Sequence, residues 1–238
     1  MAFHFSPKIV TDGLVFYIDA YNTKSYPGTG TNVNDLTPNQ INGTLINGVG
    51  FDGKSWSFDG INDYINCDSL VPLVQNDTEG TIDIWLTPTV IPSDNPKMIF
   101  GFNDTTDEAY ILFRITTNGG LNANIRNNPS LVNWVFVADN PIFTAGETIN
   151  LTFAKDSVDT KLYVNGELEP ITYTNATDKT DWVNAINVDS ILIGANNYNT
   201  GTAIRHINAD FASLKYYNRA LSASEVKQNY DALKSRFL

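Results

Sequence analysis

The sequence predicts an all-β protein, folded as a sandwich or barrel of antiparallel strands. Aromatic residues make up 12% of the chain and charged residues only 17%, a mixture that suits strands joined by polar turns. Apolar and polar residues alternate in many short segments, and clusters of Asn, Gly, Pro and Asp separate these segments. The 238 residues are within the range in which an all-β chain still forms one domain.

The strands are predicted from the period-two alternation, and the turns from the residues between them. The clearest hairpin is "LYVNGELEPI" (162–171), because Asn165-Gly166 can adopt the positive φ angles of a type I′ turn. The predicted strands are 14–19, 81–88, 97–102, 110–117, 121–126, 134–139, 148–155, 160–166, 190–195 and 212–218, and the turn clusters are 118–120, 127–130, 155–159 and 196–201. Many short strands at this spacing indicate antiparallel pairs.

One helix is predicted, over 222–238 at the C-terminal end. Ser222 can cap its first turn while Glu225 reaches back to the Ser222 amide, which makes a capping box. An apolar stripe follows at helical spacing, and it predicts that the helix docks on the sandwich. The stripe consists of Val226, Tyr230, Leu233 and Phe237. The predicted organisation is therefore an N-terminal arm (1–12), the sandwich (13–221) and the docked helix (222–238).

Composition argues against several classes of partner. The formal net charge of −11 argues against a nucleic acid as partner, because binding a phosphate backbone needs clustered Lys and Arg. No apolar run approaches the ~18 residues that span a bilayer, so no membrane partner is expected. Cys67 is the only cysteine, and no intrachain disulfide can form. The first residues lack the basic and apolar regions of a secretory signal.

Four stretches resemble one family. "GLVFYIDAYNTKSYPGTGTNVNDLTPNQINGTLINGVGFDGKSWSFDGINDYI" (13–65) is similar to the opening of LamG-like jelly rolls, members of the concanavalin A-like lectin/glucanase superfamily. "GTIDIWLTPT" (80–89) resembles the strand that follows in those domains, and "KLYVNGEL" (161–168) resembles their paired-strand hairpin. "LKYYNRALSASEVKQNYDALKSRF" (214–237) is similar to their closing strand and terminal helix. The "KSYPGTGT" segment and the final block look most like versions carried on tailed-phage virion proteins.

The resemblance implies a two-sheet antiparallel jelly-roll sandwich of the concanavalin A-like type. In such domains the concave face and its rim loops bind glycans or partner proteins. Glucanases of the superfamily carry two glutamates that flank an aspartate on one strand, and nothing here matches that pattern. Glu79 and Asp83 lie too far apart along a strand to form a close catalytic pair, and Glu167 and Glu169 lie in a hairpin. We therefore expect that the chain is not an enzyme.

A glycan site would use exposed aromatic rings, which stack on sugars, together with amide side chains that hydrogen-bond to hydroxyls. The candidates are Tyr198 and Asn197 in "GANNYNTGT", Trp134 after "NNPSLVN", and Trp182 in "DKTDWVN". Because Trp is usually buried, both tryptophans have a core interpretation beside the binding one. Tyr198 is the best candidate, since the Gly and Asn around it predict an exposed loop.

The predicted function is a non-catalytic structural or adhesion protein of a phage virion, as a capsid decoration, head fibre or tail-associated protein with weak glycan binding. Its partners would be other virion proteins, its own copies in a homo-oligomer, or a cell-surface glycan, and Phe3 and Phe5 of the arm could anchor it. It would be made in the host cytoplasm and lie on the virion surface. The alternative is a secreted bacterial carbohydrate-binding lectin module, and the third hypothesis is a hydrolase with an unrecognised site.

The stretch "SFDGINDYINC" (57–67) has two interpretations. Asp59, Asn62 and Asp63 could hold a calcium ion, which needs six to eight oxygen ligands. In related LamG-like domains that bind calcium, an Asp from the strand before the closing block contributes. Ala212 stands there in this chain, and Asp210 is displaced by two positions, which weakens the calcium hypothesis. The other interpretation is a turn between paired strands, with Gly60 at positive φ; calcium is the one cofactor left open.

Overall fold

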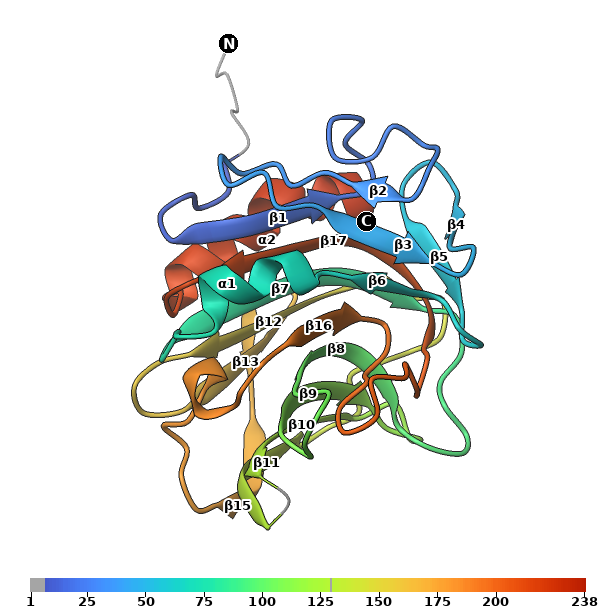
Figure 1. Ribbon diagram of the computed structural model, residues 1–238. Coiled ribbons are helices and arrows are strands. Elements are labelled where there is room, and N and C mark those ends of the chain that lie inside the picture. Colours follow the sequence, from blue (N-terminus) through green and yellow to red (C-terminus); the bar gives the residue numbers. More distant parts are fainter. Residues whose placement is uncertain (1–6, 129) are drawn as a thin grey trace.

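The computed structural model describes residues 7–128 and 130–238. In this part of the chain two antiparallel sheets stack face to face as a sandwich (Figure 1). The predicted all-β fold and the C-terminal helix are confirmed. The predicted Asn165-Gly166 turn is confirmed as well, with φ angles of 52° and 81°. The proposed anchor residues Phe3 and Phe5 lie outside the described residues.

One sheet has eight strands in the described residues, and its centre is formed by the two long strands that carry the "TIDIWL" and "ASLKYY" segments. Its order is β14 (Glu167–Glu169), β13 (Thr160–Val164), β12 (Ile149–Lys155), β7 (Gly80–Pro88), β17 (Asn208–Tyr217), β5 (Trp56–Asp59) and β4 (Gly50–Phe51), with β1 (Leu14–Asp19) also paired to β17. The first and the last strand of the chain, β1 and β17, are therefore hydrogen-bonded neighbours in this sheet.

The other sheet has nine strands in the described residues. Its order is β15 (Ile171–Ala176), β11 (Leu131–Ala138), β10 (Leu121–Asn128), β9 (Tyr110–Ile115), β8 (Lys97–Asn103), β16 (Ser190–Ile193), β6 (Tyr64–Asn66), β3 (Gly43–Ile46) and β2 (Asn32–Val33). The sequence did not predict β2 to β4, which are too short to show a period, and it placed β5 and β6 only as the strands beside the 57–67 turn. The six-residue strand β15 was not predicted either.

Side chains alternate between the core and the outer face along each strand. On β7, Ile82 and Ile84 enter the main core, whereas Asp83 and Trp85 lie on the opposite side of the sheet. The same alternation on β17 sends Lys215 outward, directly opposite Asp83 in the register. The eight-stranded sheet therefore carries large and charged side chains on its outer face, and these need a cover.

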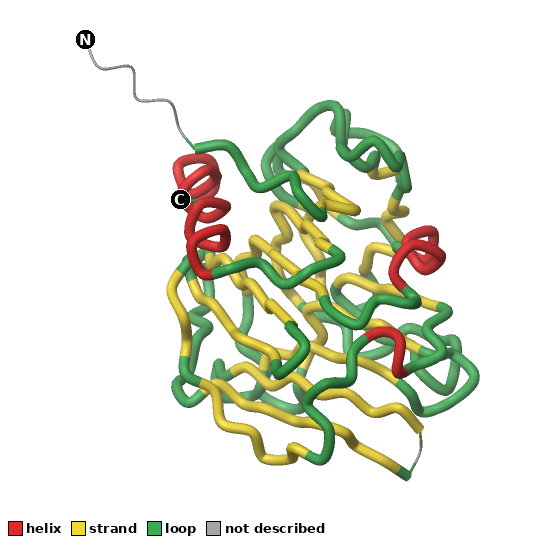
Figure 2. Tube along the Cα trace, turned by 90° about the vertical axis from the view of Figure 1, so that its left-hand side faces the viewer, coloured by secondary structure: helices red, strands yellow, loops and turns green. Residues whose placement is uncertain are grey.

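Helix α2 (Ala223–Phe237) supplies most of this cover (Figure 2). The Trp85 ring stacks on Tyr230 at a centroid distance of 5.6 Å and contacts Phe237 at 5.1 Å. Val226 and Leu233 are buried, so the predicted apolar stripe does face the sheet. The remaining helices are short: η1 (Asp68–Leu70), α1 (Val71–Val74) and η2 (Val183–Ala185). Within the described residues, no helix is both long and apolar enough to cross a membrane.

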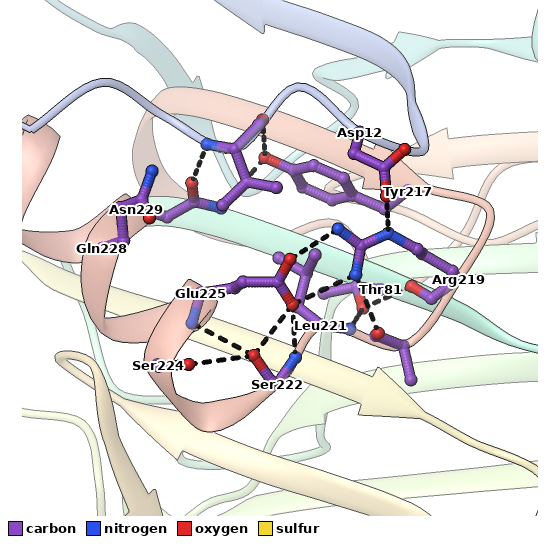
Figure 3. Close-up of polar contacts among 12 residues, drawn as sticks. Asp12, Thr81, Tyr217, Arg219, Leu221, Ser222, Ser224, Glu225, Gln228 and Asn229 are labelled. Atoms are coloured by element: carbon purple, nitrogen blue, oxygen red, sulfur yellow. Dashed lines mark hydrogen bonds and ion pairs between the residues drawn. The ribbon is translucent and has the colours of Figure 1, made fainter.

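A buried amide joins the helix, the sheet and the N-terminal arm (Figure 3). Asn229 Oδ1 accepts a hydrogen bond from the Val10 amide at 2.8 Å, and Asn229 Nδ2 donates to the Tyr217 hydroxyl at 2.9 Å. The same Nδ2 donates to Asp83 Oδ2 at 3.3 Å, and the Tyr217 hydroxyl donates to the Val10 carbonyl at 3.0 Å. Asn229 can make these bonds only when α2 is in its native position on the sheet, and they hold residues 7–12 against the helix.

An ion pair is buried below the helix. Lys215 Nζ lies 3.5 Å from Asp83 Oδ1, and both side chains are almost fully excluded from solvent. Asn150 Nδ2 donates to the same Asp83 oxygen at 2.9 Å, and Lys215 Nζ lies 5.0 Å from the centroid of the Tyr17 ring. Burying two charges is costly, so either residue alone would be strongly unfavourable here.

The start of α2 confirms the predicted capping box. The Ser222 hydroxyl accepts from the Glu225 amide, and the Glu225 carboxylate accepts from the Ser222 amide (Figure 3). Arg219 adds a bidentate pair to Glu225, with its Nη2 2.6 Å from Oε1 and its Nη1 3.1 Å from Oε2. These bonds, the Arg219 pair first, lower the pKa of Glu225 to about 2.

Candidate functional site

The outer face of the nine-stranded sheet is polar at its centre. On β9, Ile111 and Phe113 enter the main core, so Tyr110, Leu112 and Arg114 point to the other side. The register sets Arg114 opposite Asn122 of β10. Because side chains two residues apart on one strand share a face, this strand pair places an arginine among amides.

A hairpin loop, 196–205, folds over part of this face. Asn196 and Ile204 exchange backbone hydrogen bonds of 3.1 and 2.8 Å, which close the loop. Within the loop, the half-buried Tyr198 packs on Tyr110 at a ring-centroid distance of 4.4 Å. Met98 and Leu112 are buried in the same small cluster. The loop thus presents Tyr198 from an apolar base rather than as a freely mobile side chain.

Arg114 is fixed by neutral groups. Its Nη2 donates to the Oδ1 atoms of Asn122 and Asn124, the second at 2.9 Å, while its buried Nε has no hydrogen-bond partner. Burial lowers the pKa of Arg114, and Arg205 nearby lowers it further. The arginine face is the name used below for this surface, formed by Tyr110, Arg114, Asn122, Asn124, Tyr198 and Arg205.

A neighbouring arginine behaves differently. Arg126, on the same side of β10, pairs with Glu108, with 2.6 Å between Nη1 and Oε2. Glu108 also accepts a hydrogen bond from Asn199 Nδ2 at 3.4 Å, which links it to the loop. A carboxylate therefore matches Arg126. Within residues 7–128 and 130–238, no carboxylate forms an ion pair with Arg114 or Arg205.

The four residues predicted to bind a glycan lie in different parts of the structure. Tyr198 does lie on the arginine face. Asn197 is buried beneath the loop, where its Nδ2 donates to Ser190 Oγ at 3.0 Å, so it supports the loop instead of facing outward. The binding interpretation of Trp134 and Trp182 is wrong, because both are fully buried in the main core. Their alternation sends them inward, which is the core interpretation that the sequence left beside the binding one.

Arg114 was missed by sequence reasoning. In the "YILFRITT" segment it is one charged residue in an apolar strand, and it stands at a position that alternates with the core-facing Phe113 and Ile115. The amides in "LNANIR" alternate in the same way, but only the β9–β10 register brings the two sets together. An arginine in an otherwise apolar strand was therefore the available signal.

The "SFDGINDYINC" stretch is a turn, but it does not join paired strands. Asp59 Oδ1 accepts from the amides of Ile61 at 2.7 Å and Asn62 at 3.5 Å, and Asp63 Oδ2 accepts from the Asp59 amide at 3.1 Å. Gly60 takes the predicted positive φ, 79°. The expectation of paired strands is wrong, because β5 before the turn belongs to the eight-stranded sheet and β6 after it to the nine-stranded sheet. The turn therefore carries the chain from one sheet to the other.

The proposed calcium ligands meet only in part. Asp59, Asp63 and Asp210 line one surface hollow of about 470 Å³. Asn62 does not line it, and its carbonyl accepts from Asn47 Nδ2 at 2.9 Å. Among residues 7–128 and 130–238, no three His, Cys, Asp or Glu side chains are grouped closely enough to hold a metal ion. Asp59 and Asp63 accept hydrogen bonds within the turn, and burial raises the pKa of Asp63.

The structure shows where three of the carboxylates considered for hydrolysis lie. Asp83 is enclosed beneath α2 with Lys215 and Asn229, where no substrate reaches it. Glu167 and Glu169 belong to the edge strand β14, on the same β13–β14 hairpin. Asp83 is therefore not accessible to a substrate.

Comparison with known proteins places the fold in a family. The two antiparallel sheets and the closing strand β17 define a lectin-like β-sandwich. The family model described as the concanavalin A-like lectin/glucanases superfamily matches residues 58–227. The chain therefore belongs to that superfamily. No curated protein sequence matches it.

Solved structures share the fold at low identity. The CBM40 of the Ruminococcus gnavus IT-sialidase, bound to α2,3-sialyllactose, has a TM-score of 0.62 and 16% identity over 73% of this chain and 95% of that chain. The Trypanosoma rangeli sialidase has a TM-score of 0.67 and 12% identity, over 98% of this chain but 36% of that one. The leech intramolecular trans-sialidase has a TM-score of 0.60 and 18% identity, over 75% and 27%. This chain thus spans about a third of those two sialidase chains, and the likeness concerns the fold.

Proposed function

We propose that this chain is a non-catalytic carbohydrate-binding module and that its glycan site is the arginine face. The observation that carries the proposal is the combination of a supported aromatic ring, Tyr198, with the Arg114 guanidinium and two amide side chains on one sheet face. Aromatic rings stack on the apolar faces of sugars, and planar donors bind sugar oxygens. The R. gnavus CBM40 bound to sialyllactose, a module of similar fold and size, supports the same function.

The side chains of the arginine face need little reorganisation when a ligand binds. Tyr198 is already packed on Tyr110, and the Arg114 Nη2 is already held by Asn122 and Asn124. Side chains that are ordered before binding lose less conformational entropy when a ligand arrives. The arginine face therefore loses little conformational entropy on binding, so a few contacts can be enough to hold a glycan.

A glycan array with the purified chain tests the proposal. We expect binding to a defined set of glycans and an affinity lower by about two- to tenfold for Tyr198→Ala, since stacking on an aromatic ring contributes roughly 0.5–1.5 kcal/mol. Tyr21→Ala is the matched control, because Tyr21 is an exposed tyrosine that lies outside the arginine face. The bound glycan should be recovered intact after prolonged incubation; its cleavage would revive the hydrolase hypothesis. An array without any bound glycan would overturn the proposal.

The location of the protein is a separate proposal. The resemblance of the "KSYPGTGT" segment and the final block to tailed-phage proteins supports a place on the virion surface, after synthesis in the host cytoplasm, together with self-association. Mass spectrometry of purified virions of the source would detect the polypeptide if this is correct. Its presence in the medium of uninfected cells would support the secreted bacterial module instead. Either location is compatible with glycan binding.

A further inference from the structure

The arginine face holds two positive charges that no acidic side chain matches. Arg205 lies near enough to Arg114 to make the positive charge of Arg114 less favourable. Two neighbouring cations cost folding free energy, more so where one is largely buried. The chain carries 26 acidic residues against 15 basic ones, so carboxylates are abundant elsewhere. The lack of one at this place, within the described residues, is a local property of the face.

The contacts that Arg114 does make leave its charge in place. Asn122 and Asn124 offer amide oxygens, which orient the guanidinium without neutralising it. Arg126, on the same side of the next strand, has Glu108 for a partner. The fold therefore provides a counter-charge for one arginine of this sheet face and only orientation for the other. Local exceptions of this kind, in an otherwise consistent structure, are expected at functional sites.

Arg205 is held beside Arg114 by backbone bonds. Its carbonyl accepts from the Met98 amide at 3.0 Å, and Met98 is opposite Arg114 in the β8–β9 register. Its φ angle of 58° is in the left-handed region, which is unfavourable for a residue with a Cβ. The loop thus keeps Arg205 in this position at some conformational cost.

We infer that the glycan bound on the arginine face carries a carboxylate, and that Arg114, with Arg205 beside it, recognises this group. The inference rests on the proposed function and adds the ligand class. Arg114 Nη1 makes no hydrogen bond within the described residues and can donate to a carboxylate oxygen, while Asn122 and Asn124 hold Nη2 and fix the plane of the guanidinium. The carboxylate supplies the missing negative charge, and Tyr198 stacks on the sugar ring that bears it. Because the net charge of −11 repels anions from the rest of the surface, selectivity for an acidic sugar depends on this pair of arginines.

The test compares two glycans that carry a carboxylate with one that carries none. Isothermal titration with 3′-sialyllactose, digalacturonic acid and lactose gives the dissociation constants for the wild type, Arg114→Gln, Arg205→Gln and Arg126→Gln. We expect the acidic ligands to bind at least tenfold more tightly than lactose. Arg114→Gln should weaken that binding by ~10–100-fold, the effect of a charge-assisted hydrogen bond. Arg205→Gln should weaken it by less, and the matched control Arg126→Gln by no more than about twofold.

Two further results distinguish the possible failures. Arg114→Lys keeps the charge but loses the two bonds to Asn122 and Asn124 that orient it, so it should retain only part of the affinity. Equal affinity for lactose and sialyllactose, or an Arg114→Gln variant that binds the acids as well as wild type does, overturns the ligand class and leaves the glycan-binding proposal standing. A protein that binds no glycan on the array overturns both. Circular dichroism of each variant confirms that a loss of affinity is not a loss of fold.

Discussion

The eight-stranded sheet turns its outer face toward helix α2 and residues 7–12, whereas the outer face of the nine-stranded sheet carries the loop 196–205. Both faces carry a long cationic side chain on a β-strand. On the covered face, Lys215 is paired with Asp83 and shut off from water. On the arginine face, Arg114 is held by amides and has no acidic partner among the described residues.

The partners of Lys215 and Arg114 distinguish a structural charge from a functional one in this sandwich. The covered face satisfies its polar groups internally: Asn229 bonds to Val10, Tyr217 and Asp83, so the cover is specific to one helix position. The arginine face leaves the neutralising group to be supplied from outside. Burial alone does not make this distinction, because both cations are wholly or largely buried. The partner of each cation does.

Removing each cation in turn should give the largest difference in stability between the two faces. Lys215→Met leaves Asp83 charged and buried without its partner, and we expect the free energy of unfolding to fall by about 3–5 kcal/mol. Arg114→Met removes an unmatched charge, so its unfolding free energy should change by less than about 1 kcal/mol. Urea denaturation at pH 7 measures both.

The double variant Asp83→Asn/Lys215→Met is the control for the first result. It should regain much of the stability that Lys215→Met loses, because no uncompensated charge remains. If Arg114→Met proved as damaging as Lys215→Met, the two faces would not differ in the way described.

The next largest effect concerns the buried amide. Asn229→Leu leaves the Val10 amide without its acceptor and removes one of the two bonds of the Tyr217 hydroxyl, which still donates to the Val10 carbonyl; the expected loss is about 2–3 kcal/mol of unfolding free energy. Gln228→Ala on the neighbouring exposed position removes one bond, to the Lys8 carbonyl, and should cost about 0.5 kcal/mol or less. Equal losses for the two variants would mean that the covered face is held by apolar contact alone. Thermal and urea denaturation measure the difference.

The parts of the fold that could be predicted from sequence are those with enough residues to show a period. The strand 81–88 and the stripe of the final helix are long enough, and Ser222 with Glu225 marks the helix start by local chemistry. Strands β2 to β6 could not be found in this way, since two to four residues do not establish alternation. The "FDGINDYI" turn was recognised by its residues, but the change of sheet across it depends on pairing with distant strands.

The binding face was only partly predictable for a related reason. Tyr198 was found because Gly and Asn predict an exposed loop. Trp134 and Trp182 were candidates because a sequence shows that a ring exists and not which sheet face it occupies; the structure buries both. Arg114 depends on the register between two strands, and its lack of an acidic partner depends on every side chain that reaches the same surface. Such a property belongs to the folded chain.

A smaller effect separates matched from unmatched carboxylates through pH. Asp77 accepts from the Tyr216 hydroxyl at 2.8 Å, and burial raises its pKa from 3.8 to about 6. Between these two pH values the folded state binds more protons than the unfolded state, so this group's contribution to stability falls as pH rises through that range. Asp77→Asn keeps an acceptor for Tyr216 and should raise the unfolding free energy at pH 7 by about 1 kcal/mol, after allowance for partial solvent screening.

Denaturation at pH 7 and at pH 4.5 measures this effect. The advantage of Asp77→Asn over wild type should shrink at the lower pH, where the folded wild type is largely protonated at this residue. An advantage that is the same at both pH values would show that Asp77 does not titrate as described. In that case unmatched charge would not be a cost in this fold, and the argument for the arginine face would lose support.

The smallest effect has the opposite sign and belongs to the covered face. Glu225 is matched by Arg219 and its pKa is lowered from 4.5 to about 2, so its stabilising contribution is complete above pH 4.5 and is lost as pH falls toward 2. Glu225→Gln should cost about 0.5–1 kcal/mol at pH 7, because the pair is partly exposed and the cap is only half removed. At pH 3 the variant and wild type should be closer in stability. Lys227→Gln, which removes an exposed pair with Asp231 in the same helix, should cost less than about 0.5 kcal/mol at either pH. A Glu225→Gln deficit that does not shrink on acidification would mean that α2 is capped by geometry and not by matched charge, and the contrast with Arg114 would then rest on the buried Asp83–Lys215 pair alone.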